Sequence, residues 1–129
     1  MMRLLLDTCT FIWISGEVER LSEEAKDRIT DPSNEVFLSS ASVWEIALKF
    51  TRGRLILTEP PERFVPKNRE RHGLAELPIT EDAALQLTRL PSHHNDPFDR
   101  ILICQAISES MTILTPDQLI RQYPVKTFW

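Results

Sequence analysis

Short apolar segments alternate along the chain with longer segments whose hydrophobic residues recur at helical spacing. The short segments predict five strands, at Arg3–Leu6, Val36–Ser39, Ala75–Leu77, Met111–Leu114 and Val125–Phe128. The longer segments predict helices, at Thr10–Ser15, Ser22 to about Thr30, Ser40 or Ser42 to near Gly53, Pro61–Gly73, Thr80 to about Leu90, Pro97–Ser110 and Pro116–Arg121. Strands that alternate with helices imply a parallel sheet covered on both faces, so we expect an α/β fold.

Composition limits the classes of function that this fold serves. The 129 residues, 42% of them hydrophobic, suffice for one domain, which we expect to span residues 1–129. The net charge of −4 does not suit a protein built to neutralise duplex DNA, although a local basic strip stays possible. Neither GxGxxG nor GxxxxGK[ST] occurs, which argues against dinucleotide and P-loop nucleotide binding.

The N-terminus and the cysteines favour a cytoplasmic protein. The apolar run before Asp7 is too short for the core of a signal peptide or for a membrane span. Cys9 and Cys104 both sit among apolar residues, so we expect reduced core thiols rather than a disulfide. Two cysteines also do not make a structural zinc site by themselves.

Five acidic residues fall where predicted strands end or predicted helices begin. Asp7 follows the first strand, and Glu45 lies near the start of the helix after the second strand. Asp96 and Asp99 begin the most apolar helix, and Asp117 lies just after the fourth strand. In a parallel α/β sheet these positions share the carboxyl edge, where such sheets bind ligands. We therefore expect all five acids at one edge of the sheet.

Helix capping is the competing explanation for several of these acids. Asp96 before Pro97 is typical of an N-cap followed by proline, and it places Asp99 at the third helical position. Asp117 follows Thr115-Pro116, a similar helix start, where the helix dipole stabilises an acid by about 0.3–1 kcal/mol. Ser42-Val43-Trp44-Glu45 fits a capping box, although a cap at Ser39 or Ser40 fits equally well.

Asp7 is harder to explain by capping. A carboxylate at the end of a buried strand is costly to desolvate, and its neighbours in the sequence include no obvious cationic partner. Carboxylates that meet at one edge also raise each other's pKa values unless a cation neutralises them. Oxygen ligands without paired cysteines or histidines favour Mg²⁺ or Mn²⁺ over zinc. Such a site suits phosphodiester hydrolysis assisted by one or two ions.

Other polar residues are secondary candidates. Thr8 and Thr115 each lie close to an acid, where they would orient a carboxylate or water, or satisfy the backbone at a turn. Lys49 and Arg52 belong either to an RNA-binding strip or to a solvated helix face. Arg100 is a candidate to pair with a structural carboxylate or with an RNA phosphate.

Four segments resemble the successive motifs of PIN domains, most closely those of VapC-like toxins of toxin–antitoxin pairs. The segments are LLDT at Leu5–Thr8, SSASVWEI at Ser39–Ile46, HHNDPFDRILICQA at His93–Ala106 and ILTPD at Ile113–Asp117. The similarity implies a three-layer α/β/α fold with a mainly parallel sheet of about five strands. It also implies a Mg²⁺- or Mn²⁺-dependent endoribonuclease whose acidic positions are Asp7, Glu45, Asp99 and Asp117, with Asp96 a cap or an acid outside the ligand set.

The same resemblance implies partners: an RNA substrate, a cognate antitoxin that obstructs the acidic pocket, and a second copy of the chain. We expect part of the apolar surface on the helices at Thr10–Thr30 and Ser42–Arg52 to form a groove for an antitoxin helix. The residues concerned are Phe11, Trp13, Ile14, Val43, Trp44 and Leu48. The alternatives are a catalytically silent PIN module that binds RNA or protein, and a different metal-dependent phosphohydrolase.

Overall fold

The computed structural model describes all residues from Met1 to Trp129. The strands are β1 (Arg3–Leu6), β2 (Glu35–Ser39), β3 (Ala75–Leu77), β4 (Thr112–Leu114) and β5 (Thr127–Phe128). The α-helices are α1 (Thr8–Gly16), α2 (Glu23–Thr30), α3 (Ser40–Thr51), α4 (Pro61–Arg71), α5 (Glu81–Gln86) and α6 (Pro97–Glu109). Three short 3₁₀ turns complete the chain, η1 (Val18–Arg20), η2 (Leu87–Arg89) and η3 (Ile120–Gln122).

The five strands form one sheet in the order β3-β2-β1-β4-β5. Every neighbouring pair is parallel, and in the central strand β1 Leu5 lies opposite Phe37 on one side and Ile113 on the other. The α/β fold with a parallel sheet of about five strands is therefore confirmed.

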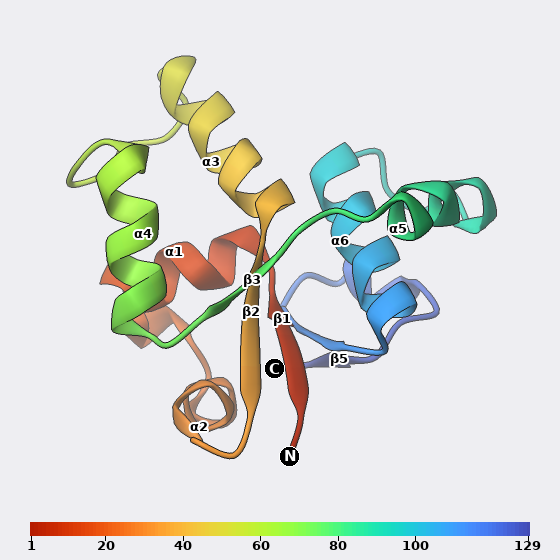
Figure 1. Ribbon diagram of the computed structural model, residues 1–129, viewed down its shortest axis with the longest axis horizontal. Helices are drawn as coiled ribbons and strands as arrows, with labels where there is room; N and C mark the ends of the chain where they lie inside the picture. The colour runs from red at the N-terminus through yellow and green to blue at the C-terminus, as the bar shows by residue number, and fades with distance from the viewer.

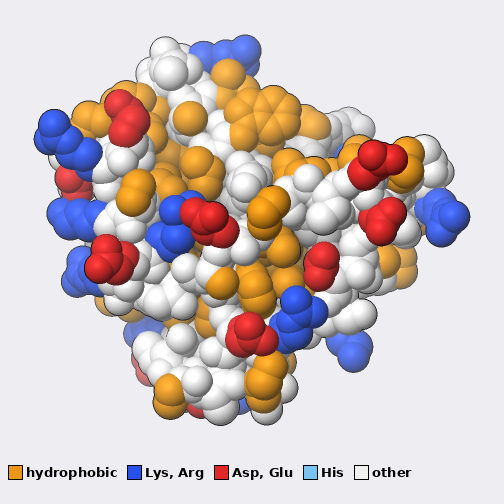
Figure 2. All heavy atoms as spheres, in the orientation of Figure 1, with side chains coloured by type: hydrophobic (Ala, Val, Ile, Leu, Met, Phe, Trp, Pro, Cys, Tyr) orange, Lys and Arg blue, Asp and Glu red, His pale blue; other side chains and the backbone are white.

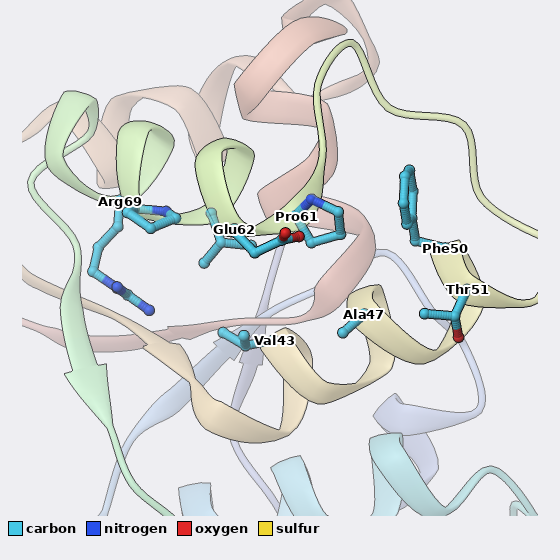
Figure 3. Close-up of a pocket in the computed structure, with 9 residues that line it drawn as sticks. Val43, Ala47, Phe50, Thr51, Pro61, Glu62 and Arg69 are labelled. Carbon is cyan, nitrogen blue, oxygen red and sulfur yellow. The ribbon is translucent and has the colours of Figure 1, made fainter.

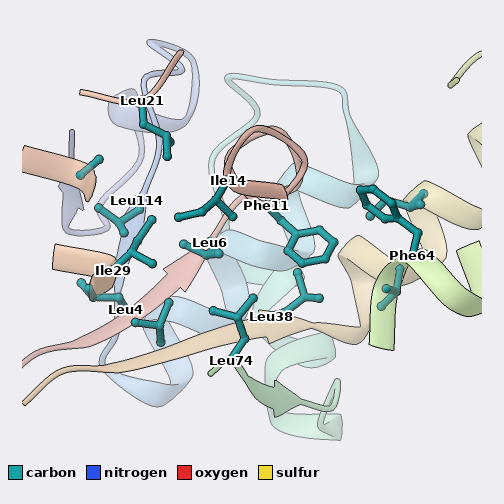
Figure 4. Packing of buried hydrophobic residues seen from close by; sticks show 14 residues of the cluster. Leu4, Leu6, Phe11, Ile14, Leu21, Ile29, Leu38, Phe64, Leu74 and Leu114 are labelled. Atoms are coloured by element: carbon teal, nitrogen blue, oxygen red, sulfur yellow. The ribbon is translucent and has the colours of Figure 1, made fainter. Parts of the chain in front are cut away.

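Alternate residues of β1 supply the cores on the two faces of the sheet. Leu4 and Leu6 belong to a buried cluster with residues of α1 to α4, such as Phe11 and Phe64 (Figure 4). Leu5 belongs to a second cluster, built mainly on α6. A strand buried on both faces in this way reads as a continuous hydrophobic run. Figure 1 shows the resulting three layers, with α1 to α4 on one side of the sheet and α5 and α6 on the other.

The structure corrects some predicted element boundaries. Helix α1 begins at Thr8 rather than Thr10, because Asp7 itself is the N-cap. The helix expected at Pro116–Arg121 shrinks to η3, which follows a turn at Asp117 whose carboxylate accepts from the Leu119 N–H. The end of the Thr80-capped helix is a 3₁₀ turn, and η1 was not expected from the sequence.

The two cysteines differ in their surroundings. Cys104 is buried on α6, as expected, but Cys9 is exposed on the first turn of α1. The prediction of a core thiol at Cys9 was therefore wrong, because helix α1 turns this side chain toward the carboxyl edge of the sheet. No helix has both the length and the apolar character needed to cross a membrane.

Candidate active site

A pocket of about 250 Å³ lies at the carboxyl edge of the sheet. It draws its side chains from the end of β1 and the first turn of α1, from α3, from the start of α6 and the loop before it, and from the turn after β4. Figure 1 shows α3 and α6 on opposite sides of these strand ends. All five acids line this pocket. Its full lining is Asp7, Thr8, Cys9, Glu45, Lys49, His94, Asp96, Asp99 and Asp117.

Asp7 is held by two hydrogen bonds at the floor of this pocket. Its Oδ1 accepts from the Thr10 backbone N–H at 2.8 Å, and its Oδ2 accepts from the Thr115 hydroxyl at 2.5 Å. The side chain is 4% exposed, and burial raises the pKa of Asp7 against the opposing effect of these hydrogen bonds. Asp7 is thus also the N-cap of α1, which the sequence did not indicate.

Glu45 faces Asp7 across the pocket from α3. Its Oε1 accepts from the Thr8 hydroxyl at 2.7 Å, and its Oε2 pairs with the Lys49 ammonium one turn further along the helix at 2.5 Å. This hydrogen bond from Lys49 to Glu45 is the main reason why the pKa of Lys49 is raised. The N-cap of α3 is Ser39, which was one of the alternatives left open by the sequence, so Glu45 takes no part in capping the start of the helix.

The start of α6 brings three more polar side chains to the pocket. Asp96 is the N-cap, and its Oδ1 accepts from the backbone N–H groups of Phe98 and Asp99. The Oδ2 of Asp99 lies 2.9 Å from Nε2 of His94. Burial, with the negative charge of Asp96 next in size, raises the pKa of Asp99 to about 7.

Asp117 completes the cluster from a turn, not from a helix. The Thr115 hydroxyl accepts from the Asp117 backbone N–H at 3.0 Å, and Asp117 Oδ1 accepts from the Leu119 N–H at 2.8 Å. The same Thr115 hydroxyl donates to Asp7, so this threonine links the ends of β1 and β4.

One histidine that sequence reasoning did not assign belongs to the site. Side-chain atoms able to bind a metal ion, one each from His94, Asp99 and Asp117, lie within 4.8 Å of one another. The signal was present in the sequence, since His94 precedes Asp96 by two residues, but a histidine in a loop carries no periodicity that fixes where its ring points.

The candidate RNA-binding cations have different positions. Lys49 lines the pocket, and Arg52 is exposed at the C-cap of α3. Arg100 donates to the Pro91 carbonyl and to the Tyr123 hydroxyl, and of its two candidate roles the contact with an RNA phosphate stays a prediction. On the face shown in Figure 2, Lys and Arg side chains are interspersed with Asp and Glu and form no continuous basic band.

A second hollow, of about 380 Å³, separates α3 from α4. Figure 3 shows Val43 and Ala47 of α3 on one side of it and Pro61 of α4 on the other. We call this hollow the α3–α4 groove; its lining is Val43, Ala47, Phe50, Thr51, Pro61, Glu62, Val65, Pro66 and Arg69. Of the residues expected to form a partner groove, Val43 lines the α3–α4 groove, whereas Phe11 and Ile14 are buried in the core.

The two tryptophans assigned to the core or to a partner groove lie outside the α3–α4 groove. Trp13 is half-buried and packs edge-on against Trp129, with a ring-centre separation of 5.9 Å. Trp44 is 59% exposed and contacts Phe98 edge-on at 4.8 Å, which joins the N-terminal turns of α3 and α6.

Known proteins similar to this chain are ribonucleases. Ribonuclease VapC22 of Mycobacterium tuberculosis is 28% identical over 124 residues, which cover 95% of this chain and 93% of that protein. Ribonuclease VapC16 of the same organism is 36% identical over 56 residues, covering 43% of this chain and 40% of that protein.

Solved structures share the fold over nearly the whole chain. VapBC2 of Rickettsia felis, bound to a DNA fragment from its promoter, gives a TM-score of 0.72 at 14% identity, with 99% of each chain covered. DNA-bound VapBC of Salmonella typhimurium gives 0.71 at 18% identity, with 99% of this chain and 98% of that chain covered. The sequence pattern of the PIN domain matches residues 4–126. Because this match spans nearly the whole chain, and because the fold and the acidic pocket agree with it, the chain belongs to the PIN domain family.

Proposed function

We propose that this protein is a divalent-metal-dependent endoribonuclease that acts as the toxin of a toxin–antitoxin pair. The observation that carries the proposal is the meeting of Asp7, Glu45, Asp99 and Asp117, from four separate segments, in one pocket. Among the residues that line the pocket, Lys49 is the only lysine or arginine, and it is already paired with Glu45. A divalent cation is the natural partner for the remaining negative charge.

The side chains of the pocket fit Mg²⁺ or Mn²⁺. Carboxylate oxygens are the ligands that both ions accept, and neither cysteine pairs nor histidine pairs are present to favour zinc. Burial, with neighbouring carboxylates adding to its effect, raises the pKa values of Asp7 and Asp99, and a positive charge in the pocket would oppose this rise. A bound ion supplies that charge, together with activation of a water molecule and stabilisation of the leaving oxygen.

Residues around the four acids hold them in place. The Thr8 hydroxyl fixes one oxygen of Glu45, and the Thr115 hydroxyl fixes one oxygen of Asp7. The Lys49 ammonium stands at the rim, where it leaves Glu45 partly neutralised and offers positive charge to an RNA phosphate. Asp96 caps α6, and the resemblance to PIN domains leaves it outside the four acidic positions, so we assign it to capping and not to metal binding.

The test is cleavage of RNA by the full chain with Mn²⁺, with Mg²⁺ and with EDTA. We expect cleavage with either metal, no cleavage in EDTA, and loss of cleavage in Asp7→Asn and Asp99→Asn. Asp82→Asn is the matched control, because Asp82 also lies in the first turn of a helix but outside the pocket. Melting temperature is the second measurement, and Mn²⁺ should raise it because the ion binds only the assembled site.

Two further measurements, made beside RNA cleavage, distinguish the alternative functions. A silent binding module would leave RNA intact in Mn²⁺ while still retaining it on a filter. A metal-dependent phosphomonoesterase would release phosphate from small esters without cutting internal bonds of RNA. Either outcome would contradict the proposed function.

We place the antitoxin in the α3–α4 groove. The side chains at Val43 and Ala47 face this groove, while Glu45 and Lys49 of the same helix face the acidic pocket. An apolar helix in the groove therefore needs only to cross α3 to bring an Arg or Lys to the acids. The structural relatives whose names include VapBC support a protein partner of this kind.

We also expect the chain to form a homodimer through a face other than the α3–α4 groove. Sedimentation of the purified chain at micromolar concentration should give twice the 15.0 kDa monomer mass. A monomer under these conditions would contradict this part of the proposal.

A further inference from the structure

His94 lines the pocket, but the four-acid arrangement gives it no role. Its side chain is 16% exposed, and its Nε2 lies 2.9 Å from Asp99 Oδ2. Two neighbouring ligand atoms around one ion with bonds of about 2.1 Å lie about 3 Å apart, which is close to this separation. Asp117 offers a third donor atom within the same 4.8 Å cluster.

The loop that carries His94 is anchored in the structure. The backbone N–H of His93 donates to the Tyr123 hydroxyl at 3.1 Å, and Arg100 donates to that hydroxyl and to the Pro91 carbonyl. The ring of His93 packs edge-on against Tyr123, so only the second histidine faces the acids. This anchoring fixes the backbone from which the His94 ring reaches the pocket.

We propose that His94 supplies an imidazole nitrogen to the ion held by Asp99 and Asp117, and that the pocket therefore prefers Mn²⁺ to Mg²⁺. The inference rests on the metal site of the proposed function and deepens it. Imidazole is a common ligand of transition ions, whereas Mg²⁺ binds oxygen and keeps several of its waters. A mixed site of one nitrogen and two or more carboxylates consequently gains more affinity for Mn²⁺ than for Mg²⁺.

The direct test is pulsed electron paramagnetic resonance of the Mn²⁺-loaded full chain. We expect echo modulation from a coupled ¹⁴N nucleus, and replacement of that signal by a ¹⁵N pattern when the protein is grown with ¹⁵N-histidine. The isotope identifies a histidine without any substitution. A bound-Mn²⁺ spectrum with no nitrogen coupling would overturn this inference and leave the proposed function standing, whereas failure to bind Mn²⁺ at all would overturn both.

Calorimetry of metal binding identifies which histidine is the ligand. His94→Gln should weaken Mn²⁺ binding by about tenfold or more, because it removes a ligand and the hydrogen bond to Asp99, and should change Mg²⁺ binding much less. His93→Gln is the matched control and should bind both ions as the unsubstituted chain does. Equal losses for Mn²⁺ and Mg²⁺ in His94→Gln would mean that His94 only positions Asp99 and would overturn the nitrogen ligand.

Discussion

Asp99 is the residue at which burial and neighbouring charge act together most strongly. Its pKa rises from the usual 3.8 to about 7, first because the side chain is buried and next because Asp96 lies close to it. The hydrogen bond from His94 opposes this rise but does not cancel it. Burial and the nearby negative charge therefore favour the protonated form of Asp99. A bound divalent ion would instead favour the ionised carboxylate.

This shift predicts how stability depends on pH in the metal-free protein. An acid whose pKa is higher in the folded state binds more protons folded than unfolded, so the free energy of unfolding falls as pH rises between the two values. We expect the melting temperature to fall between pH 3.8 and about 7 partly because of Asp99, and Asp99→Asn to flatten that fall. Asp82→Asn should melt as the unsubstituted chain does at each pH. An unchanged fall in Asp99→Asn would contradict this explanation.

At the scale of elements, the N-terminal turns of helices carry much of the site. The N-cap of α1 is Asp7, and the first turn of α6 carries both Asp96 and Asp99. Helix N-termini expose backbone N–H groups and a partial positive charge, which stabilise carboxylates. The parallel sheet places these N-termini at one edge, so residues that cap their own helices also face a shared pocket.

Asp96 tests whether capping and metal binding are separate. Asp96→Asn preserves a side-chain acceptor for the cap, so we expect little change in melting temperature and retained RNA cleavage. Asp96→Ala removes the acceptor and should cost about 1 kcal/mol of stability, or about 3 °C in melting temperature. Thermal unfolding and cleavage assays on both variants provide the measurement. Loss of cleavage in Asp96→Asn as complete as in Asp99→Asn would show that Asp96 binds the ion.

At the scale of the whole molecule, α3 separates two surfaces. The acidic pocket lies on one side of this helix and the α3–α4 groove on the other. The pocket is polar and built on the strand ends, whereas the groove is apolar at its base and lined by two helices of one layer (Figure 3). We therefore expect a substitution in the groove to weaken binding of the proposed antitoxin while leaving the acidic pocket unchanged.

Ala47→Arg tests this separation. The longer charged side chain would fill the groove, so we expect binding of the co-expressed antitoxin to weaken by about tenfold or more. RNA cleavage and melting temperature should stay close to those of the unsubstituted chain. The control is Ala84→Arg, the same substitution at an exposed position of α5. Antitoxin bound to Ala47→Arg with unchanged affinity would place the partner elsewhere.

The sequence alone was sufficient for the layout of the fold. The apolar run at Leu4–Leu6 matches strand β1 because these residues are fully buried, which leaves no polar position among them. The cap at Asp96 was also readable, because Asp-Pro is a local signal. This layout was enough to predict that Asp7, Glu45, Asp99 and Asp117 meet at one edge of the sheet.

Only the tertiary structure decided what each side chain does at that edge. The Thr115 hydroxyl reaches Asp7 across 108 positions of the chain, and Thr8 reaches Glu45 across 37. No local pattern encodes such contacts, because they depend on which strands become neighbours and on the angle at which helices pack. For this reason the sequence could not show where the ring of His94 points, that Cys9 is exposed, or which residues line the α3–α4 groove. Hydrophobic periodicity is a property of one segment, whereas a binding site is a property of several segments together.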